Sequence, residues 1–446
     1  MPYLLNLIYV TLILAAMPWL VYCAVRKGKY REGYTAKFFG LVPRRTGQKT
    51  CIWLHAVSVG EVNLLVTLLG EIKRQRPGWE CVISTTTMTG MALAKKKYAG
   101  FSVFYCPLDF TWAVKTAMRR IRPDVLVLAE LELWPNLVRA ARRSGAKVAV
   151  INGRMSEHSF RGYRRIKPLV AKILRQVDLV AAQDETYAER FRELGAPSVH
   201  VTGSMKYDGA RTDRNNPQTR QLATLAGFED DEIVFLAGST QEPEESVAVE
   251  VFRRLHERWP RLRLVLVPRH PDRFDSVARL LDETGIPWQR RTELDTRCRG
   301  AETRRILLVD AIGELGAWWG TAAIAFVGGS LGKRGGQNMI EPAAYGAAVS
   351  FGPNTRNFCD IVSAMLARDA AVVVADGGQL ERFVRRCLEE PDFATALGHR
   401  AKSLVLQQLG ATERTFQLLA ALKEEGEISH RRHLSAPRRK SCRTGL

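Results

Sequence analysis

The sequence is poor in the features that mark several common protein classes. Its eight cysteines include no C-x-x-C pair, so neither a zinc knuckle nor a redox dithiol is indicated. There is also no D-x-D pair and no histidine cluster. Acidic residues are scarce, because 46 Asp and Glu stand against 66 Lys and Arg, for a formal net charge of +20. This imbalance favours phosphate-rich partners, namely nucleic acid, an anionic membrane surface or a phosphorylated substrate.

Long apolar runs are absent except at the N-terminus. From Tyr3 to Ala24 the chain is almost wholly apolar, which is the length of one bilayer crossing, about 20 residues. Basic residues follow this run instead of preceding it, the reverse of a cleaved signal peptide. The positive-inside rule then places the rest of the chain in the cytoplasm. We therefore expect an anchor that either spans the membrane or lies in one leaflet; the alternative is a buried core helix.

After residue 50 the sequence alternates short apolar runs with amphipathic segments. Runs such as CIWLHAV, DVLVLAE and KVAVING are typical of buried parallel strands. The rhythm breaks over the polar residues 207–232, which we interpret as a linker, and then resumes. Two such series predict two doubly wound, Rossmann-like α/β domains, with ligands expected in a cleft between them at the carboxyl ends of the strands. The predicted parts are an anchor (1–25), an N-terminal domain (26–207), a C-terminal domain (208–426) and a basic, disordered tail (427–446).

Polar residues follow three predicted strands of the first domain. Ser58-Val59-Gly60-Glu61 fits a capping box, so Glu61 either closes the start of a helix or faces a substrate. Glu130 and Glu132 end a strand that should be buried, where a carboxylate is more often functional than structural. Lys206 follows another strand just before the linker. It could reach a phosphate or be an ordinary surface lysine.

The second domain has a glycine-rich stretch, FVGGSLGKRGGQNMIEPAAYG, that begins at Phe326. It is neither a P-loop nor a G-x-G-x-x-G fingerprint. We expect its open backbone N–H groups to lead into a helix near Asn338, where a phosphate can bind without a metal. Glu341 could then accept hydrogen bonds from a ribose, whereas a tight turn with close helix–strand packing is the alternative. Arg269 ends another strand and would supply positive charge to a leaving nucleotide.

Six segments taken together, HAVSVGE, LELWPN, GSMKYD, PRHPDRF, IGEL and GGSLGKRGGQNMIEPAA, resemble the 3-deoxy-D-manno-octulosonic acid (Kdo) transferases of lipid A assembly. The resemblance runs in order from the N-terminal anchor to about residue 420. It implies a GT-B glycosyltransferase at the cytoplasmic face of the bacterial inner membrane. Such an enzyme moves Kdo from CMP-Kdo to the phosphorylated lipid A precursor (lipid IVA), inverts the anomeric centre, and uses neither a cofactor nor a metal.

The resemblance also implies roles for individual residues. Glu61 resembles the general base, and Glu130 and Lys206 resemble the transition-state stabilisers. Segments similar to the CMP-binding ones contain Pro268, Arg269, Ile312, Gly313, Glu314, Asn338, Met339, Ile340 and Glu341. The sequence departs from the family at Ala311, where Thr is usual, and at Gln337, where His is common.

Two other functions compete with this interpretation. A GT-B enzyme that uses a UDP-sugar would have the same fold, although the PRH and IGEL segments argue against it. A basic nucleic-acid-binding protein would interleave aromatic residues with Lys and Arg on an exposed surface. The tryptophans here mostly lie in or beside apolar runs, so we expect no nucleic-acid partner. The expected partners are CMP-Kdo, the lipid A precursor and an anionic inner-membrane surface.

Overall fold

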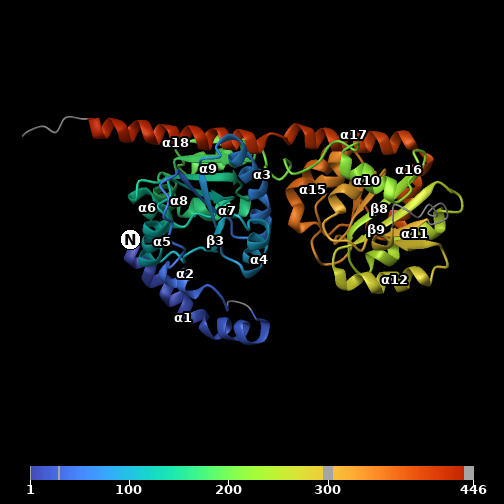
Figure 1. Ribbon diagram of the computed structural model, residues 1–446, viewed down its shortest axis with the longest axis horizontal. Helices are drawn as coiled ribbons and strands as arrows, with labels where there is room; N and C mark the ends of the chain where they lie inside the picture. Colours follow the sequence, from blue (N-terminus) through green and yellow to red (C-terminus); the bar gives the residue numbers. More distant parts are fainter. Residues whose placement is uncertain (1, 29–30, 295–304, 436–446) are drawn as a thin grey trace, which may run out of the picture. The chain divides into compact units, whose positions relative to one another are not determined.

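The computed structural model describes residues 2–28, 31–294 and 305–435. The chain divides into two compact units, each built around one parallel sheet (Figure 1). The first unit contains residues up to Asp208 together with those from Leu409 onward, and the second contains Gly209–Gln408. The prediction of two doubly wound α/β domains is therefore confirmed.

The sheet of the first unit has seven strands in the order β3-β2-β1-β4-β5-β6-β7. The strands are β1 (Cys51–His55), β2 (Glu80–Thr85), β3 (Ser102–Tyr105), β4 (Val125–Ala129), β5 (Lys147–Gly153), β6 (Leu179–Ala182) and β7 (Val199–Val201). The helices are α1 (Pro2–Lys27), α2 (Tyr34–Phe39), α3 (Val59–Gln75), α4 (Met88–Lys97), α5 (Thr111–Ile121), α6 (Pro135–Arg143), α7 (Glu157–Arg165), α8 (Lys167–Leu174), α9 (Glu185–Glu193) and α18 (Ala411–Ser435).

Each face of this sheet is covered by its own apolar core, as continuous apolar strands require. Along β1, Trp53 packs with residues of α5, α6 and α8, whereas Leu54 packs with residues of α3 and α18. This alternation follows from the two-residue period of a strand. Helices α5 and α6 therefore cover one face of the sheet, and α3 and α18 cover the other.

The second unit has its own seven-stranded parallel sheet, in the order β10-β11-β9-β8-β12-β13-β14. The strands are β8 (Ile233–Thr240), β9 (Leu262–Pro268), β10 (Trp288–Arg290), β11 (Ile306–Leu308), β12 (Ile324–Val327), β13 (Ala348–Phe351) and β14 (Val372–Val373). The α-helices are α10 (Pro217–Leu225), α11 (Glu244–Leu255), α12 (Phe274–Asp282), α13 (Leu315–Trp318), α14 (Ile340–Tyr345), α15 (Cys359–Leu366), α16 (Gly377–Glu389) and α17 (Pro391–Gln408).

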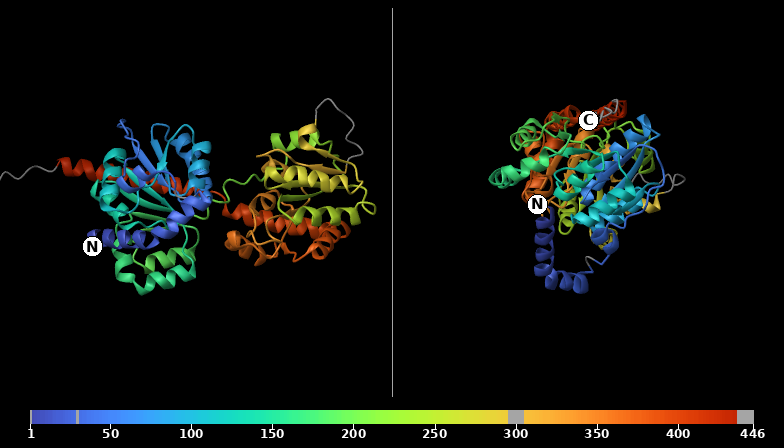
Figure 2. Two further views of the ribbon diagram at one scale, coloured as in Figure 1. Left: turned by 90° about the horizontal axis from the view of Figure 1, so that it is seen from below. Right: turned by 90° about the vertical axis from the view of Figure 1, so that its left-hand side faces the viewer.

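Helix α1 is long and apolar enough to cross a membrane, and only 6% of its most apolar stretch is buried. The alternative of a buried core helix is therefore wrong. Pro18 lies inside the helix and removes one backbone hydrogen bond there. The ribbon changes direction along α1, as Figure 2 shows.

The C-terminal boundaries differ from the prediction. We expected residues 208–426 to form one domain, but the chain from Leu409 onward belongs to the first unit. Phe416 and Leu419 of α18 are buried in the same core as Leu69 and Ile72 of α3. Disorder was expected from residue 427, whereas α18 extends to Ser435; residues 436–446 lie outside the described part of the chain.

The segment 207–232 was interpreted as a linker but contains α10. Asn216 caps this helix and Pro217 occupies its first turn. The Thr219 hydroxyl donates a hydrogen bond to the Ala317 carbonyl oxygen at 3.0 Å. The side chain of Arg214 donates to three backbone carbonyls, those of Tyr345, Gly320 and Ala322. Most of this polar stretch is therefore part of the second unit.

Candidate functional site

The predicted catalytic residues lie at the point where the strand order of the first sheet reverses. Strands β1 and β4 are hydrogen-bonded neighbours. From β1 the chain continues to β2, towards one edge of the sheet, and from β4 it continues to β5, towards the other edge. Glu61 lies in the first turn of α3, which follows β1, and Glu130 follows β4 directly. Ligands of doubly wound sheets bind at such a switch point, beyond the carboxyl ends of the strands.

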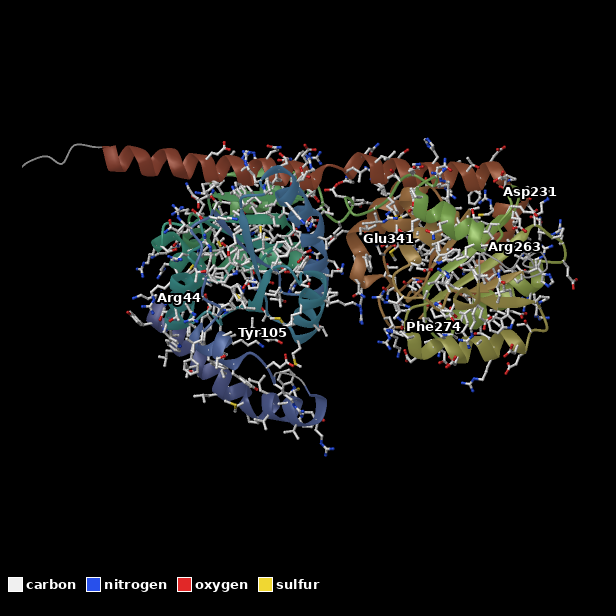
Figure 3. All side chains as sticks on the ribbon, viewed as in Figure 1. Arg44, Tyr105, Asp231, Arg263, Phe274 and Glu341 are labelled. Atoms are coloured by element: carbon white, nitrogen blue, oxygen red, sulfur yellow. The ribbon has the colours of Figure 1, made fainter. Side chains whose placement is uncertain are left out.

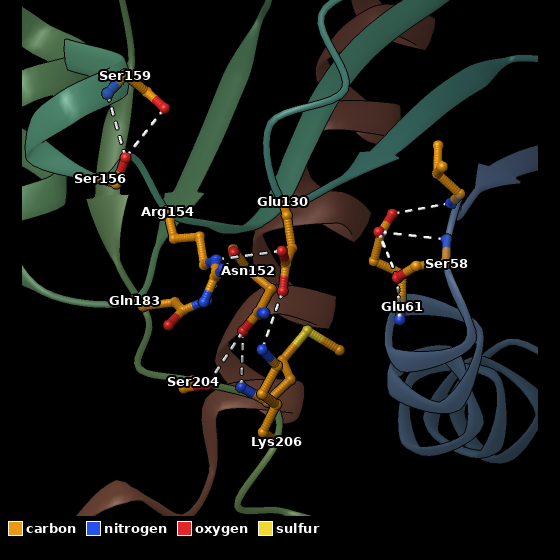
Figure 4. Close-up of polar contacts among 12 residues, drawn as sticks. Ser58, Glu61, Glu130, Asn152, Arg154, Ser156, Ser159, Gln183, Ser204 and Lys206 are labelled. Atoms are coloured by element: carbon orange, nitrogen blue, oxygen red, sulfur yellow. Dashed lines mark hydrogen bonds and ion pairs between the residues drawn. The ribbon is translucent and has the colours of Figure 1, made fainter. Parts of the chain in front are cut away.

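Glu61 closes a capping box, which is the structural interpretation that its spacing favoured. The Ser58 hydroxyl oxygen accepts the Glu61 N–H at 3.3 Å, and the Ser58 N–H donates to Glu61 Oε1 at 3.3 Å. The Ser58 hydroxyl also donates to Oε1 at 2.7 Å, and the Val57 N–H donates to Oε2 at 2.8 Å (Figure 4). The carboxylate thus turns back onto the start of α3.

This cap leaves the Glu61 carboxylate able to accept a further hydrogen bond. A carboxylate has about four lone-pair sites, and three are used here, two on Oε1 and one on Oε2. The residue is only 8% exposed. Burial raises the pKa of Glu61, its hydrogen bonds to Ser58 and Val57 oppose that rise, and the nearby charge of Glu130 adds to it. The side chain is therefore fixed in orientation and more basic than an exposed glutamate.

Glu130 is held between two cations. Its Oε1 lies 3.0 Å from Lys206 Nζ, and its Oε2 lies 3.2 Å from Arg154 Nε (Figure 4). The backbone of Glu130 has φ of 54°, a left-handed conformation that costs a non-glycine residue about 1–3 kcal/mol. The structure therefore brings Glu130 and Lys206 into direct contact, as two residues acting together would require. Arg154 carried no prediction, although it is a cation directly after β5.

Two further residues belong to this site: Asn152, which was not singled out from the sequence, and Glu132, which was singled out with Glu130 but was given no catalytic role. Asn152, near the end of β5, has φ of 51°, and its Oδ1 accepts hydrogen bonds from Met205 N (3.0 Å) and Ser204 Oγ (3.4 Å). It thereby fixes the loop that carries Lys206. Glu132 accepts a hydrogen bond from Trp134 Nε1 at 3.1 Å. Burial, assisted by the charges of Glu61 and Glu130, raises the pKa of Glu132 to about 7.

In the second unit, two of the predicted nucleotide segments come together at Glu341, which is labelled in Figure 3. Burial raises the pKa of this carboxyl, while a hydrogen bond from Asn338 Nδ2 (3.0 Å) and the charge of Arg269 oppose the rise. Arg269 follows β9, and its N–H donates to the Thr240 carbonyl oxygen at the end of β8. Residues after three of the adjacent strands, β9, β8 and β12, thus meet at one edge of the sheet.

Other predicted nucleotide-binding residues have different surroundings. Ile312 is 77% exposed, and Gly313 adopts φ of 94°. Glu314 forms a bidentate ion pair with Arg291, whose Nε and Nη2 donate to Oε2 and Oε1 at 2.8 and 2.9 Å. Met339 and Ile340 are buried, at 0% and 2% exposed.

The glycine-rich stretch does not offer all the free N–H groups that we expected. The N–H groups of Gly329, Ser330 and Leu331 donate to the carboxylate of Glu244, at 2.6, 2.8 and 2.9 Å. Glu244 is 1% exposed, so its carboxylate occupies the position that a phosphate would need. The following helix, α14, begins at Ile340 instead of Asn338. The expectation of a phosphate cradle is therefore wrong for residues 329–331.

Comparison with known proteins agrees with this architecture. A UDP-GlcNAc 2-epimerase from Neisseria meningitidis has 11% identity and a TM-score of 0.55, over 83% of this chain and 100% of that one. A glycosyltransferase from Rickettsia africae has 14% identity and a TM-score of 0.53, over 85% and 99%. Two doubly wound parallel sheets, with polar residues gathered at the carboxyl ends of their strands, form the architecture of the GT-B fold.

The sequence comparison is more specific. The profile of the family described as 3-deoxy-D-manno-octulosonic-acid transferase (kdotransferase) matches residues 33–209. A 3-deoxy-D-manno-octulosonic acid transferase from Haemophilus influenzae is 32% identical over 426 residues, which cover 92% of this chain and 97% of that one. The chain belongs to the Kdo transferase family, and it is an enzyme of the glycosyltransferase class.

Proposed function

We propose that this enzyme transfers Kdo from CMP-Kdo to the phosphorylated lipid A precursor, lipid IVA, with inversion of the anomeric centre and without a metal. One observation carries the proposal for the catalytic residues. Glu61 and Glu130 follow the neighbouring strands β1 and β4 at the switch point of the first sheet, and Lys206 pairs with Glu130 there, in a member of the Kdo transferase family. The donor assignment rests on the family together with the Arg269–Glu341 cluster of the second unit.

In the proposed step, an acceptor hydroxyl oxygen attacks the anomeric carbon as the bond from that carbon to the CMP phosphate oxygen breaks. The electron pair of that bond leaves with CMP, and the hydroxyl proton passes to Glu61 Oε2, which has an unused lone pair. Inversion follows because the nucleophile enters opposite the leaving group. The raised pKa of Glu61 makes it a better proton acceptor than an exposed glutamate.

Glu130 and Lys206 act on the charges that develop during this step. The carboxylate of Glu130 stabilises positive charge on the sugar as the donor bond breaks. Lys206, held 3.0 Å from Glu130, offers its positive charge to the carboxylate of Kdo or to the departing phosphate. Arg269 and backbone N–H groups near Asn338 supply the corresponding stabilisation for the nucleotide. In this scheme the protein's own cations perform the task that a metal performs in other transferases.

We further propose that the enzyme works at the cytoplasmic face of the inner membrane, on an anionic lipid surface. The exposed apolar helix α1 and the net charge of +20 support this location. A phosphorylated lipid acceptor would reside in the same membrane. The expected partners remain CMP-Kdo, the lipid acceptor and anionic lipid.

The test is transfer by the purified full chain from CMP-Kdo to lipid IVA, with product masses read by mass spectrometry. Glu61→Gln should lose nearly all transfer and still bind CMP-Kdo in a titration calorimeter. The matched control is Ser58→Ala, which removes the other half of the capping box and should cost about 1 kcal/mol of stability but keeps the carboxylate, so transfer should fall far less than in Glu61→Gln. If Glu61→Gln stays active and only melts earlier, Glu61 is a cap and not the base.

Two further arms test the donor and the metal. The wild-type enzyme should bind CMP more tightly than UDP, and tighter UDP binding would favour a different sugar nucleotide. Transfer should persist in excess chelator. A rate that falls with chelation and returns with a divalent cation would contradict the metal-independent scheme.

A further inference from the structure

A basic groove of about 1480 Å³ runs along the first unit between α5 and α6, away from the residues described above. We call it the α5–α6 groove. Seven basic side chains and a single acidic one, Asp124, line it. The basic residues are Lys115, Arg119, Arg122, Arg139, Arg143, Lys147 and Lys423.

The one acidic residue of the α5–α6 groove is already neutralised. Asp124 Oδ1 lies 3.0 Å from Lys423 Nζ, and Asp124 Oδ2 accepts the Cys51 N–H at 2.7 Å. By contrast, neither Lys115 nor Arg143 forms a hydrogen bond or an ion pair with any residue that the structure describes. The groove therefore presents positive charge with no internal counterion for most of it, and such a surface attracts phosphate groups.

The groove lies beside the apolar anchor. Tyr3 of α1 lines the groove, and the first turns of α1 are attached to α5. Asn6 Nδ2 donates to the Thr111 hydroxyl at 2.7 Å, and the Thr111 N–H donates to Asn6 Oδ1 at 3.1 Å. Trp112, which also lines the groove, is 46% exposed and stacks on Phe110 with ring centroids 4.6 Å apart.

This order of surfaces matches the layers of a membrane. The apolar helix α1 would lie in the hydrocarbon, the exposed rings of Tyr3 and Trp112 at the interface, and the cations Lys115 and Arg143 at the level of the headgroup phosphates. We propose that the α5–α6 groove binds the phosphate headgroups of acidic membrane phospholipids. The stacking of Trp112 on Phe110 disfavours a nucleic-acid ligand, because one face of this exposed ring is already covered.

The proposed headgroup site is separate from the transfer reaction. Asp124 immediately precedes β4, whereas Glu130 immediately follows it. The groove therefore lies at the amino ends of the strands, opposite the carboxyl ends where Glu61 and Glu130 lie. In addition, α5 and α6 cover the other face of the sheet from α3, which carries Glu61. Headgroup binding in the groove therefore leaves the reacting residues unoccupied.

The experiment measures how strongly the full chain, diluted from neutral detergent, partitions into vesicles. The quantity of interest is the ratio of the partition coefficients for vesicles with 30% phosphatidylglycerol and for pure phosphatidylcholine, because α1 contributes to both. The groove variant is Lys115→Gln, Arg139→Gln and Arg143→Gln together. Each cation near an anionic surface contributes roughly fivefold, so the ratio should fall roughly 100-fold at low salt.

The matched control removes the same charge elsewhere on the first unit, by Arg164→Gln, Arg165→Gln and Lys167→Gln on α7 and α8, where all three residues are exposed. This control should keep the ratio within about threefold of wild type. Equal losses in both variants would mean diffuse surface attraction and would overturn the groove site. So would an unchanged ratio in the groove variant, or binding that appears only when lipid IVA is added to the vesicles.

Two additional arms identify the source of the phosphate. Inorganic phosphate at the headgroup concentration should not displace the wild-type protein from the acidic vesicles, and displacement would indicate a free-phosphate site. A single-stranded oligonucleotide that competes better than the vesicles would overturn the lipid proposal. The groove variant should retain wild-type transfer to lipid IVA in neutral detergent, whereas Glu61→Gln should lose transfer and keep the wild-type partition ratio. The two proposals therefore fail independently.

Discussion

The carboxylate of Glu244 holds the glycine-rich loop of the second unit, and its removal should loosen that loop by a predictable amount. Oε2 accepts N–H groups from Gly329 (2.6 Å) and Gln241 (3.0 Å), and Oε1 accepts those of Ser330 (2.8 Å) and Leu331 (2.9 Å). Glu244→Gln replaces one oxygen with an NH₂ group, which cannot accept. Two of the four hydrogen bonds are then lost, because the two backbone N–H groups that pointed at that oxygen now face the NH₂ group, which is itself a donor.

The cost follows from the strength of such bonds. A hydrogen bond to a charged group contributes about 1.5–3 kcal/mol, so losing two should cost about 3–6 kcal/mol. If the loop opens locally, a cost of about 3 kcal/mol corresponds to roughly 100-fold faster amide exchange at residues 329–331. Hydrogen–deuterium exchange read by mass spectrometry measures this directly. CMP affinity should fall as well, because the same loop leads to Asn338 and Glu341.

The matched control is Glu250→Gln on the same helix, α11. Glu250 pairs with Arg253 and Arg254 at the surface, at 2.8 and 2.7 Å, and exposed pairs of this kind contribute little. This variant should exchange and melt as wild type does. The reasoning would be refuted if Glu244→Gln showed wild-type exchange at residues 329–331 and a wild-type melting temperature.

Three other outcomes are expected. The pKa of Glu132 is raised to about 7 in the folded protein, so the folded state binds this proton more tightly than the unfolded chain, and the free energy of unfolding falls as pH rises from about 4.5 to 7. Glu132→Gln should therefore melt above wild type at pH 8, with the difference closing towards pH 4; a constant difference would contradict the shift. Asn152→Ala should lower kcat by misplacing Lys206 and should be less stable than Asn152→Gly by about 1 kcal/mol, because glycine tolerates φ of 51°. Equal stability of the two variants would argue against strain at that position. Phe416→Ala should cost about 3–5 kcal/mol in urea unfolding followed by the fluorescence of Trp79, whose ring lies 6.2 Å from that of Phe416; a wild-type midpoint would mean that α18 is not part of this core.

The sequence predicted well those elements whose signal is local. Continuous apolar runs become central strands because both faces of a parallel sheet are buried, and every run that we singled out is a strand. The strand β10 (Trp288–Arg290) was missed because it is short and polar. The helix α10 was missed because its residues are mostly polar, although Asn216 and Pro217 provided start signals.

The site shows the same division. Residues that follow strands, such as Glu130 directly after β4 and Lys206 in the loop after β7, could be named because strand ends converge in this fold, and the structure brings these two into contact. The capping box of Glu61 was also visible, because it depends on a spacing of three residues. The hydrogen bond from the Gly329 N–H to Glu244 joins residues 85 positions apart in the sequence, so no local pattern could indicate it. The proposed catalytic and nucleotide-binding roles stay predictions until the variants are assayed.

The return of α18 to the first unit has a consequence for how the protein is made. Phe416 and Leu419 complete a core whose other members, such as Leu69 and Ile72, are synthesised some 340 residues earlier. At 5–20 residues per second, the ribosome needs about 10–40 s to deliver the whole second unit before α18 follows. The unit that emerges first is therefore finished last. During that interval its uncovered apolar face is a natural target for chaperones, whereas the second unit has all its strands and can fold as soon as it leaves the ribosome.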